Sequence, residues 1–346
     1  MNLSPKTLLP FLRWLPLRGE TLKADFVAGL TVALVLVPQS MAYAQLAGLP
    51  AYYGLYAAFL PVMVASLWGS SNQLGTGPVA VVSLLTASSL APFAAIGSEQ
   101  FVALAIMLAL LVGVVQLALG LFKLGVVVNF LSHPVIVGFT NAAAMIIGLS
   151  QVNKLIGVPM GRSEHFIQDI WGVAQKIGDT HLPTLAMGAA GIAIIWAIRR
   201  YAPKLPGVLI AVAATTTVSW AIGFAEGLGG QVVGKVPEGL PSVSLPTING
   251  ELIGTLLTSA IVISLVGFME AISIAKAIAA KTKEKVDPNQ ELIGQGLANI
   301  VGSFTQAFPV SGSFSRSAVN MNAGAKTGMS AVFTGLIVLL TLLLLT

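Results

Sequence analysis

Cysteine is absent from the 346 residues of the chain, which excludes disulfides and thiolate metal sites. The three histidines, His133, His165 and His181, lie far apart and do not have the spacing of metal ligands. The sequence also contains no phosphate-binding loop, no nucleophile elbow and no redox motif. We therefore predict a protein that is not an enzyme and that uses neither a metal nor a cofactor.

Charged residues are also scarce. They make up 9% of the chain, and hydrophobic residues make up 55%, whereas a soluble domain is typically about 25% charged. Because so few charges cannot cover a water-exposed surface, the composition predicts an integral membrane protein. The formal net charge of +5 would indicate nucleic-acid binding only if it formed a basic patch. Membrane topology explains this charge better, so we expect no nucleic-acid partner.

Long apolar runs recur along the chain, and most are near the ~20 residues that a spanning helix needs. Two shorter segments, Pro78–Leu90 and Phe314–Met321, open with Gly, Pro and Ser. We interpret these two as half-helices that begin inside the bilayer. The result is an all-α polytopic membrane protein with about eleven membrane segments. The long runs are Phe26–Leu46, Tyr52–Trp68, Phe101–Leu121, Val135–Leu149, Leu182–Ile198, Val208–Phe224, Leu252–Ala279, Leu292–Phe308 and Met329–Leu345.

The basic residues fit a cytoplasmic N-terminus in the cell's inner (plasma) membrane. With this orientation, thirteen of the 18 Lys and Arg residues face the cytoplasm, as the positive-inside rule requires. The two longest connections, Val152–His181 and Glu226–Gly250, then fall outside. The chain stops at Thr346 directly after an apolar run, so we expect further segments to be missing. The outward basic residues are Lys154, Arg162, Lys176 and Lys235.

The stretch Asp287-Pro288-Asn289-Gln290 predicts the start of a helix. Asp287 is a preferred N-cap residue, and Pro288 suits the first helical position. Gln290 is expected to complete a capping box by reaching back to the backbone amide of Asp287.

Two stretches repeat weakly and in the same order. "GSSNQ" at Gly69–Gln73 recurs as "GSFTQ" at Gly302–Gln306, and each is followed by small residues and a half-helix. Upstream, the segment around Gln39 aligns with the segment around Glu270 at near-equal spacing. Such segments also match by chance, but two ordered matches favour duplication. Since the first half-helix runs outward and the second inward, we interpret the copies as an inverted repeat, as in many secondary transporters.

Two half-helix starts that point at one cavity would form an anion site. A helix that begins in the bilayer leaves its first N–H groups unpaired, and its dipole adds partial positive charge there. Gly75–Val79 provides one start and Ser311–Arg316 the other. Ser313 and Ser315 would add hydroxyl donors, and Arg316 would add a fixed charge. The alternative is a loop of Ser, Gly and Pro that merely kinks a span.

Glu270 is the only acid, and Arg316 the only base, that we place deep within the spans, where each is costly. They occupy corresponding regions of the repeat, so they can face each other. Either they form a fixed ion pair that orients two helices, or Glu270 takes up a proton or a cation while Arg316 stabilises the anion. Because intramembrane ionisable residues usually mark ion pathways, we favour the second interpretation.

Gln39 and Tyr43 are further candidates on the first span. Pro38 removes one backbone donor and is expected to break the helix, so that Gln39 offers its amide to the same cavity. Tyr43 lies four residues on, on the same face. It is a ligand, a packing residue or an interfacial anchor. Asn141 and Asn299 are expected to hold helices together.

Four stretches resemble the sulfate permease family of anion transporters, which includes bacterial and plant sulfate carriers and prestin. They are "PAYYGLYAAFLPVMVASLWGSS" (Pro50–Ser71), "GPVAVVSLL" (Gly77–Leu85), "NQELIGQGLANIVGSF" (Asn289–Phe304) and "SFSRSAV" (Ser313–Val319). The resemblance covers essentially Asp25 to Thr346. It implies a seven-plus-seven inverted-repeat fold with core and gate domains, usually followed by a cytoplasmic STAS domain.

The family's plan also implies a domain scheme. Residues 1–25 are a cytoplasmic N-terminal segment, residues 26–121 and 251–346 form the core, and residues 122–250 form the first half of the gate. The remaining gate spans and the STAS domain would be absent. We expect the full-length protein to form a homodimer in the lipid bilayer.

Carried over residue by residue, the resemblance implies a substrate site and a coupling acid. Asn72 departs from the family pattern because a basic residue is common at its position. Val79 departs because an aromatic residue is common there, so the pocket wall would be smaller. The substrate residues are Gln39, Tyr43, Val79, Ser313, Ser315 and Arg316, and the coupling acid is Glu270.

The residues and the resemblance together predict a secondary active transporter of a small inorganic oxyanion. Sulfate is the first candidate, carried with a proton by an elevator-like movement of core against gate. Sodium-coupled bicarbonate transport, dicarboxylate transport with H⁺ or anion exchange would fit the same residues. A channel-like or structural membrane module without coupled transport is the alternative from another class.

Overall fold

In the computed structural model of the protein, the described residues are 9–126, 133–160, 166–203, 205, 207–234, 236–247 and 250–344. The chain divides into two compact units. One contains Met1–Leu131 and Val236–Thr346, and the other contains Ser132–Lys235. The domain scheme expected from the sequence remains a prediction. Five residues named above lie outside the described residues: Arg162, His165, Lys235, Leu345 and Thr346.

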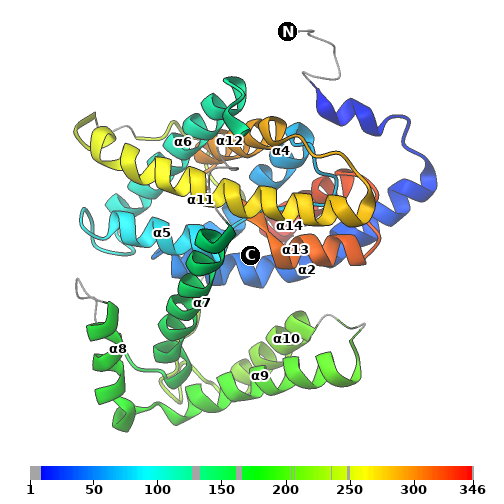
Figure 1. Ribbon diagram of the computed structural model, residues 1–346. Helices are drawn as coiled ribbons and strands as arrows, with labels where there is room; N and C mark the ends of the chain where they lie inside the picture. Colours follow the sequence, from blue (N-terminus) through cyan, green and yellow to red (C-terminus); the bar gives the residue numbers. More distant parts are fainter. Residues whose placement is uncertain are drawn as a thin grey trace. The chain divides into compact units, whose positions relative to one another are not determined.

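The first unit combines helices from both ends of the chain with one small sheet (Figure 1). In chain order its elements are η1 (Pro10–Trp14), α2 (Gly19–Leu46), α3 (Tyr52–Tyr56), α4 (Leu60–Trp68), β1 (Gly75–Gly77), α5 (Ala80–Leu90), α6 (Glu99–Leu121), α11 (Gly250–Thr282), α12 (Pro288–Phe304), β2 (Ser311–Ser313), α13 (Phe314–Asn322) and α14 (Met329–Leu344).

The second unit contains α7 (His133–Ile156), α8 (Phe166–Gln175), η3 (Ile177–Asp179), α9 (Leu182–Tyr201) and α10 (Gly207–Ala221). Within this unit α9 packs against both α10 and α7. Among the described helices, four are long and apolar enough to cross a membrane, namely α2, α6, α9 and α11.

The predicted runs agree with the helices, with two differences. The run Tyr52–Trp68 forms two helices, α3 and α4, and Pro61 lies in the first turn of the second. The connection Val152–His181 contains the helix α8, which was not predicted. Its ten residues include Gln168 and Asp169, so no continuous apolar run marks it.

Helix α2 continues through Pro38, so the predicted break is wrong. The proline removes the N–H that would pair with the carbonyl of Leu34, but the helix runs unbroken from Gly19 to Leu46. Gln39 therefore reaches its neighbours from an intact helix.

The start of α12 is largely as predicted. Asp287 is the N-cap, and its Oδ1 accepts from the backbone N–H groups of Asn289 (2.9 Å) and Gln290 (3.4 Å). Gln290 does not close a capping box. Its Nε2 instead donates to the carbonyl oxygen of Trp68 at 2.6 Å, and so caps the C-terminal end of α4.

Glycines let α6 and α12 approach until their backbones touch. A Cβ on Gly296 would lie 2.5 Å from the backbone nitrogen of Leu117 and 2.9 Å from the carbonyl oxygen of Gly113. A Cβ on Gly113 would lie 2.6 Å from the backbone nitrogen of Ile300. Small residues at such crossings are the usual means of close helix packing in membranes.

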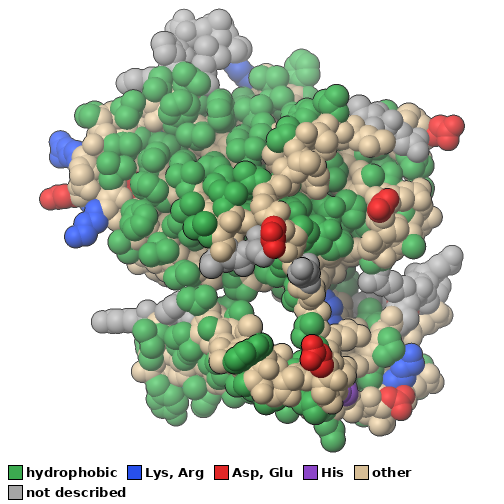
Figure 2. All heavy atoms as spheres, turned by 180° about the vertical axis from the view of Figure 1, so that it is seen from behind, with side chains coloured by type: hydrophobic (Ala, Val, Ile, Leu, Met, Phe, Trp, Pro, Cys, Tyr) green, Lys and Arg blue, Asp and Glu red, His purple; other side chains and the backbone are tan. Residues whose placement is uncertain are grey.

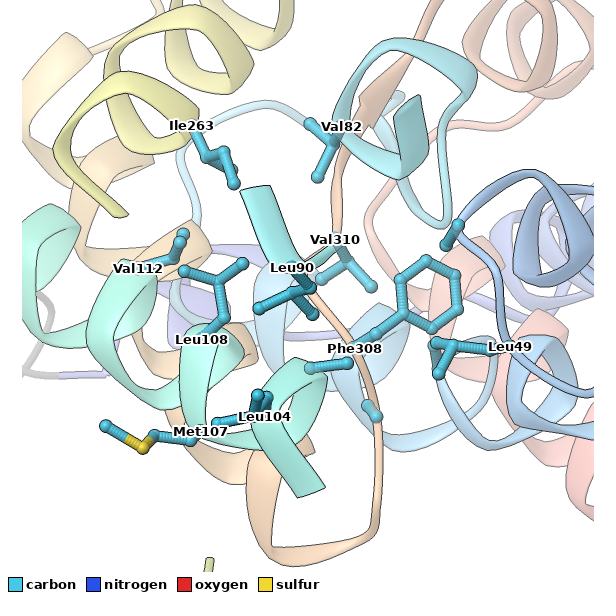
Figure 3. Close-up of a cluster of buried hydrophobic side chains, with 14 of the residues drawn as sticks. Leu49, Val82, Leu90, Leu104, Met107, Leu108, Val112, Ile263, Phe308 and Val310 are labelled. Carbon is cyan, nitrogen blue, oxygen red and sulfur yellow. The ribbon is translucent and has the colours of Figure 1, made fainter. Parts of the chain in front are cut away.

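A hydrophobic cluster holds the short helix α5 in place. Leu90 at the end of α5 packs among Leu108 of α6, Ile263 of α11 and Phe308 of the segment before β2 (Figure 3). All four side chains are buried. The cluster therefore fixes the far end of α5, and the sheet fixes its start.

Hydrophobic side chains also dominate the surface. Figure 2 shows them across the viewed face, with few charged side chains among them. Trp220 of α10 is 84% exposed and Trp196 of α9 is 63% exposed. In a bilayer such side chains contact lipid rather than water, which agrees with the composition.

Replacing Gly296 with alanine should destabilise the protein, because the new methyl group has no room between α6 and α12. Overpacking of this kind costs roughly 1–3 kcal/mol. The matched control is Gly254→Ala on α11, where nothing lies within 4 Å of the new Cβ. This change should be neutral or should stabilise by up to ~1 kcal/mol. Thermal unfolding of the purified proteins in detergent measures the difference, and equal midpoints would contradict the close packing.

Candidate functional site

The two short strands bring two helix starts together. β1 and β2 pair antiparallel, with Gly75 opposite Ser313 and Gly77 opposite Ser311. Because α5 follows β1 and α13 follows β2, the two helices leave the ribbon at opposite ends with both N-termini toward it. The prediction that two half-helices meet is therefore confirmed.

Small residues are required in this ribbon. A Cβ on Gly312 would lie 2.9 Å from Cβ of Ala271 on α11, and a Cβ on Gly75 would lie 2.9 Å from Cβ of Arg316. Gly77 has a φ of +140°, which residues with a side chain rarely adopt. The sequence "GTG" thus lets β1 lie directly against the first turn of α13.

The two helix starts differ in their caps. Val79 is the N-cap of α5 and has extended backbone, and no side chain caps this end. Ser313 is the N-cap of α13, where its Oγ accepts from the backbone N–H of Arg316 at 3.5 Å. The first amides of α5 are therefore the ones without a side-chain acceptor.

Arg316 is fully buried, yet most of its donors are unpaired. Its Nη1 donates to Oε1 of Gln39 at 3.1 Å. Its Nε and Nη2 have no hydrogen-bond partner among the described residues. The guanidinium lies beside Gly77, at which an added Cβ would be 3.3 Å from Nη2. Two buried cationic donors without acceptors are costly, and an anion would offset that cost.

Gln39 and two serines surround this guanidinium. Nε2 of Gln39 donates to Oγ of Ser315 at 3.4 Å, and the Oγ atoms of Ser315 and Ser313 are 3.2 Å apart. The structure therefore brings together four of the predicted substrate residues, from α2, β2 and the first turn of α13.

Tyr43 and Val79 are placed differently. Tyr43 lies one turn after Gln39 on α2, is partly buried, and interacts electrostatically with both Arg316 and Glu270. The side chain of Val79 is 3% exposed and packs in the hydrophobic cluster with Phe308. Val79 therefore contributes its backbone position at the start of α5, while its side chain serves packing.

Glu270 lies on α11 next to β2 but is not bonded to Arg316. The carbonyl oxygen of Gly267, one turn earlier, accepts from Oγ of Ser311 at 2.7 Å. Oε2 of Glu270 is buried and has no hydrogen-bond partner among the described residues. The carboxylate and the guanidinium attract each other at longer range. In the described part of the chain, a fixed contact ion pair between them is therefore not formed.

Two further acids, Glu291 and Asp25, are buried. Glu291 at the start of α12 accepts hydrogen bonds from N and Oγ of Ser70, at 2.6 and 2.8 Å, and from N of Ser71. Asp25 on α2 accepts from the backbone N–H groups of Lys326 (2.7 Å) and Thr327 (3.0 Å). Donors in loops satisfy both carboxylates. Each carboxylate therefore anchors a non-helical connection between two elements. The partners lie far away in sequence, so no local pattern shows this role.

Asn72 joins the N-terminal segment to the core helices. Its Oδ1 accepts from Nη2 of Arg13 (3.3 Å) and from Nε1 of Trp14 (3.1 Å). Its Nδ2 donates to Oε1 of Glu284 at 2.9 Å. An amide can accept from η1 and donate to the carboxylate at once, whereas a basic side chain can only donate.

The comparisons with known proteins agree with this architecture. A model of the sulfate permease family matches residues 22–346. The chain belongs to the sulfate permease family. It is 42% identical to sulfate transporter 4.1, chloroplastic, of Arabidopsis thaliana, over 98% of this chain and 50% of that protein.

Solved structures show the same fold. The murine Solute Carrier 26 family member A9 anion transporter, in its inward-facing state, superposes with a TM-score of 0.90 at 26% identity, covering 98% of this chain and 59% of the other. The transmembrane domain of a cyanobacterium bicarbonate transporter, BicA, gives 0.83 at 22% identity, covering 95% and 84%. The polytopic helical transporter fold predicted from the sequence is thus confirmed. The chain spans about half the length of the curated relative that it matches.

Proposed function

We propose that this protein is a secondary active transporter of a small oxyanion, with sulfate as the first candidate. The observation that carries the proposal is the fully buried Arg316, with two unpaired donor nitrogens beside the start of α5. The name of the plant relative, a sulfate transporter, supports sulfate. A tetrahedral dianion supplies acceptor oxygens in several directions, which suits donors that converge from different elements.

In this proposal each predicted substrate residue has its own part. Arg316 supplies charge and two hydrogen bonds, as guanidinium groups do for oxyanions. The free amides at the start of α5 supply further donors along the helix dipole. Ser313 and Ser315 add hydroxyls, and Gln39 holds the guanidinium in place through its Oε1. Tyr43 closes the side of the site toward α2.

Glu270 couples anion movement to a proton in this proposal. Its buried Oε2 has no partner among the described residues, and it faces the charge of Arg316 at a distance. An ionised carboxylate repels an incoming dianion, and a protonated one does not. Loading of sulfate would therefore favour protonation of Glu270, which is the thermodynamic requirement of symport.

The wider transport scheme rests on the same proposal. The two β-strand and half-helix segments are the broken helices of an inverted repeat, and they meet at mid-membrane. The core moves against the gate in an elevator-like manner, and the protein works as a homodimer in the inner (plasma) membrane.

Sodium-coupled bicarbonate transport, proton-coupled dicarboxylate transport and anion exchange remain alternatives. Competition among these anions, with proton and sodium gradients imposed separately, distinguishes them from sulfate symport.

Arg316→Ala should weaken sulfate binding by at least about tenfold, since a hydrogen bond to a charged group contributes roughly 1.5–3 kcal/mol. Arg316→Lys keeps the charge but loses the planar fork, so its loss should be smaller. The matched control is Lys276→Ala, which removes the same charge from an exposed position on α11. Binding of labelled sulfate to purified protein in liposomes measures the effect. Unchanged affinity in Arg316→Ala, together with poor folding, would instead support a structural role.

Glu270→Gln should abolish the response of sulfate uptake to a pH gradient, because glutamine does not take up a proton. Sulfate binding without a gradient should persist. The control is Glu251→Gln, which makes the same change near the start of the same helix. Uptake into proteoliposomes with and without an imposed pH gradient is the measurement. Gradient-driven uptake that survives in Glu270→Gln would exclude Glu270 as the coupling group, and no gradient response in the unaltered chain would exclude proton coupling.

The proposed orientation has a clean test because the chain lacks cysteine. Lys176→Cys should react with a membrane-impermeant maleimide in intact cells. Lys285→Cys should react only after the membrane is permeabilised, because α11 ends on the cytoplasmic side in this orientation. Both lysines are exposed. The unaltered chain is the blank, and the reverse pattern of labelling would place the N-terminus outside.

A further inference from the structure

One face of α12 carries three long polar side chains that are all buried. Glu291, Gln295 and Asn299 follow one another at intervals of four residues, so they share a helix face. Each is only 1–2% exposed. Burying such groups in an apolar protein is costly unless they are hydrogen-bonded. Each of the three bonds to a different stretch of chain outside its own helix.

Asn299 pairs with the backbone just before β2. Its Oδ1 accepts from the N–H of Val310 at 2.8 Å, and its Nδ2 donates to the carbonyl oxygen of Val310 at 3.1 Å. Nδ2 also donates to Oε1 of Gln116 on α6 at 3.0 Å. The amide therefore satisfies both polar groups of Val310, much as a neighbouring strand would. These hydrogen bonds fix the position of β2 along the axis of α12.

Gln295, one turn earlier, holds the other strand. Its Nε2 donates to Oγ1 of Thr76 at 2.9 Å, and this contact is buried. Thr76 is the central residue of β1 and lies opposite Gly312 of β2. Residues four apart on a helix are separated by ~6 Å along its axis. Through these two side chains, the single helix α12 holds β1 and β2 at a fixed position relative to each other.

This offset decides where Arg316 lies relative to α5. Arg316 is in the first turn of α13, directly after β2, and its side chain runs back along Gly75 and Gly77 of β1. Any slip of β1 against β2 would move the start of α5 relative to the guanidinium. A one-residue slip amounts to ~3.3 Å, about the length of a hydrogen bond.

We propose that Gln295 and Asn299 are positioning residues for the anion site, acting through the register of β1 and β2 without touching the anion. This inference rests on the proposed function, because it takes Arg316 and the start of α5 as the two halves of one anion site. A merely structural role predicts something different. Loss of a structural contact reduces the amount of folded protein, whereas loss of positioning weakens binding by the protein that does fold.

The test replaces hydrogen-bonding side chains with apolar ones of similar shape. The variants are Gln295→Met and Asn299→Leu, with Thr76→Val as a milder change on the other side of the Gln295 contact. The matched control is Ser303→Ala, one turn beyond Asn299, because this buried hydroxyl donates within its own helix to the carbonyl oxygen of Ile300. Labelled sulfate is titrated onto the purified full chain in liposomes, giving both Kd and the number of sites per protein.

Gln295→Met and Asn299→Leu should each raise Kd at least about tenfold, which corresponds to ~1.4 kcal/mol. Ser303→Ala should leave Kd unchanged. Thr76→Val should raise Kd as well, and combining it with Gln295→Met should add little, because both changes remove the same contact.

Fewer sites with an unchanged Kd in Gln295→Met and Asn299→Leu would overturn the positioning role and leave the proposed function intact. If neither variant folds, Thr76→Val decides, and an unchanged Kd there overturns the inference. A chain without these changes that binds no sulfate would overturn the proposed function, and the inference would fall with it.

Discussion

Irregular backbone inside an apolar protein must find hydrogen-bond partners within the chain, and the rest of this structure depends on that constraint. Each unpaired N–H or C=O in hydrocarbon costs several kcal/mol. Here the chain is non-helical at β1 and at β2, and the two segments pair with each other. The pairing is antiparallel, so it places the starts of α5 and α13 at opposite ends of one short ribbon. The glycines and the buried amides of α12 keep this ribbon packed and satisfied.

The same arrangement leaves the guanidinium of Arg316 largely unsatisfied. Its neighbours satisfy a single nitrogen through Gln39, while two donors stay unpaired inside the protein. An unsatisfied buried donor costs roughly 1–3 kcal/mol, and more when it is charged. Elsewhere in the described core, buried acids such as Asp25 and Glu291 are paired several times over. The unpaired charged donors of Arg316 are the physical reason to propose ligand binding there.

Features that depend on neighbouring residues could be predicted from the sequence. The apolar runs, the two short helices and the N-cap at Asp287 all follow from residues within one or two turns. Ser313, Ser315 and Arg316 could be grouped because the repeat placed two helix starts together, whereas Gln39 was grouped with them through a break at Pro38 that the helix does not have. The contacts that fix the site could not be predicted in this way.

The partners of these contacts are remote in sequence. Glu291 bonds to Ser70, Gln295 to Thr76, and Gln290 to the end of α4, and each partner lies more than two hundred residues away. Pro38 shows that a local signal can also mislead. Proline disfavours a helix at this position, but packing along the whole of α2 keeps the helix intact.

The separation between Glu270 and Arg316 suits coupling better than a contact ion pair would. A carboxylate bonded to the guanidinium would occupy the donors that an anion needs. The two charges attract each other without a hydrogen bond between them, so the charge of Glu270 can act on the anion position while two donors of Arg316 stay free. Because linkage is reciprocal, a proton that raises anion affinity is itself held more tightly when the anion is bound. In the proposed symport, a base with free donors and an acid held at a distance would provide this mutual dependence.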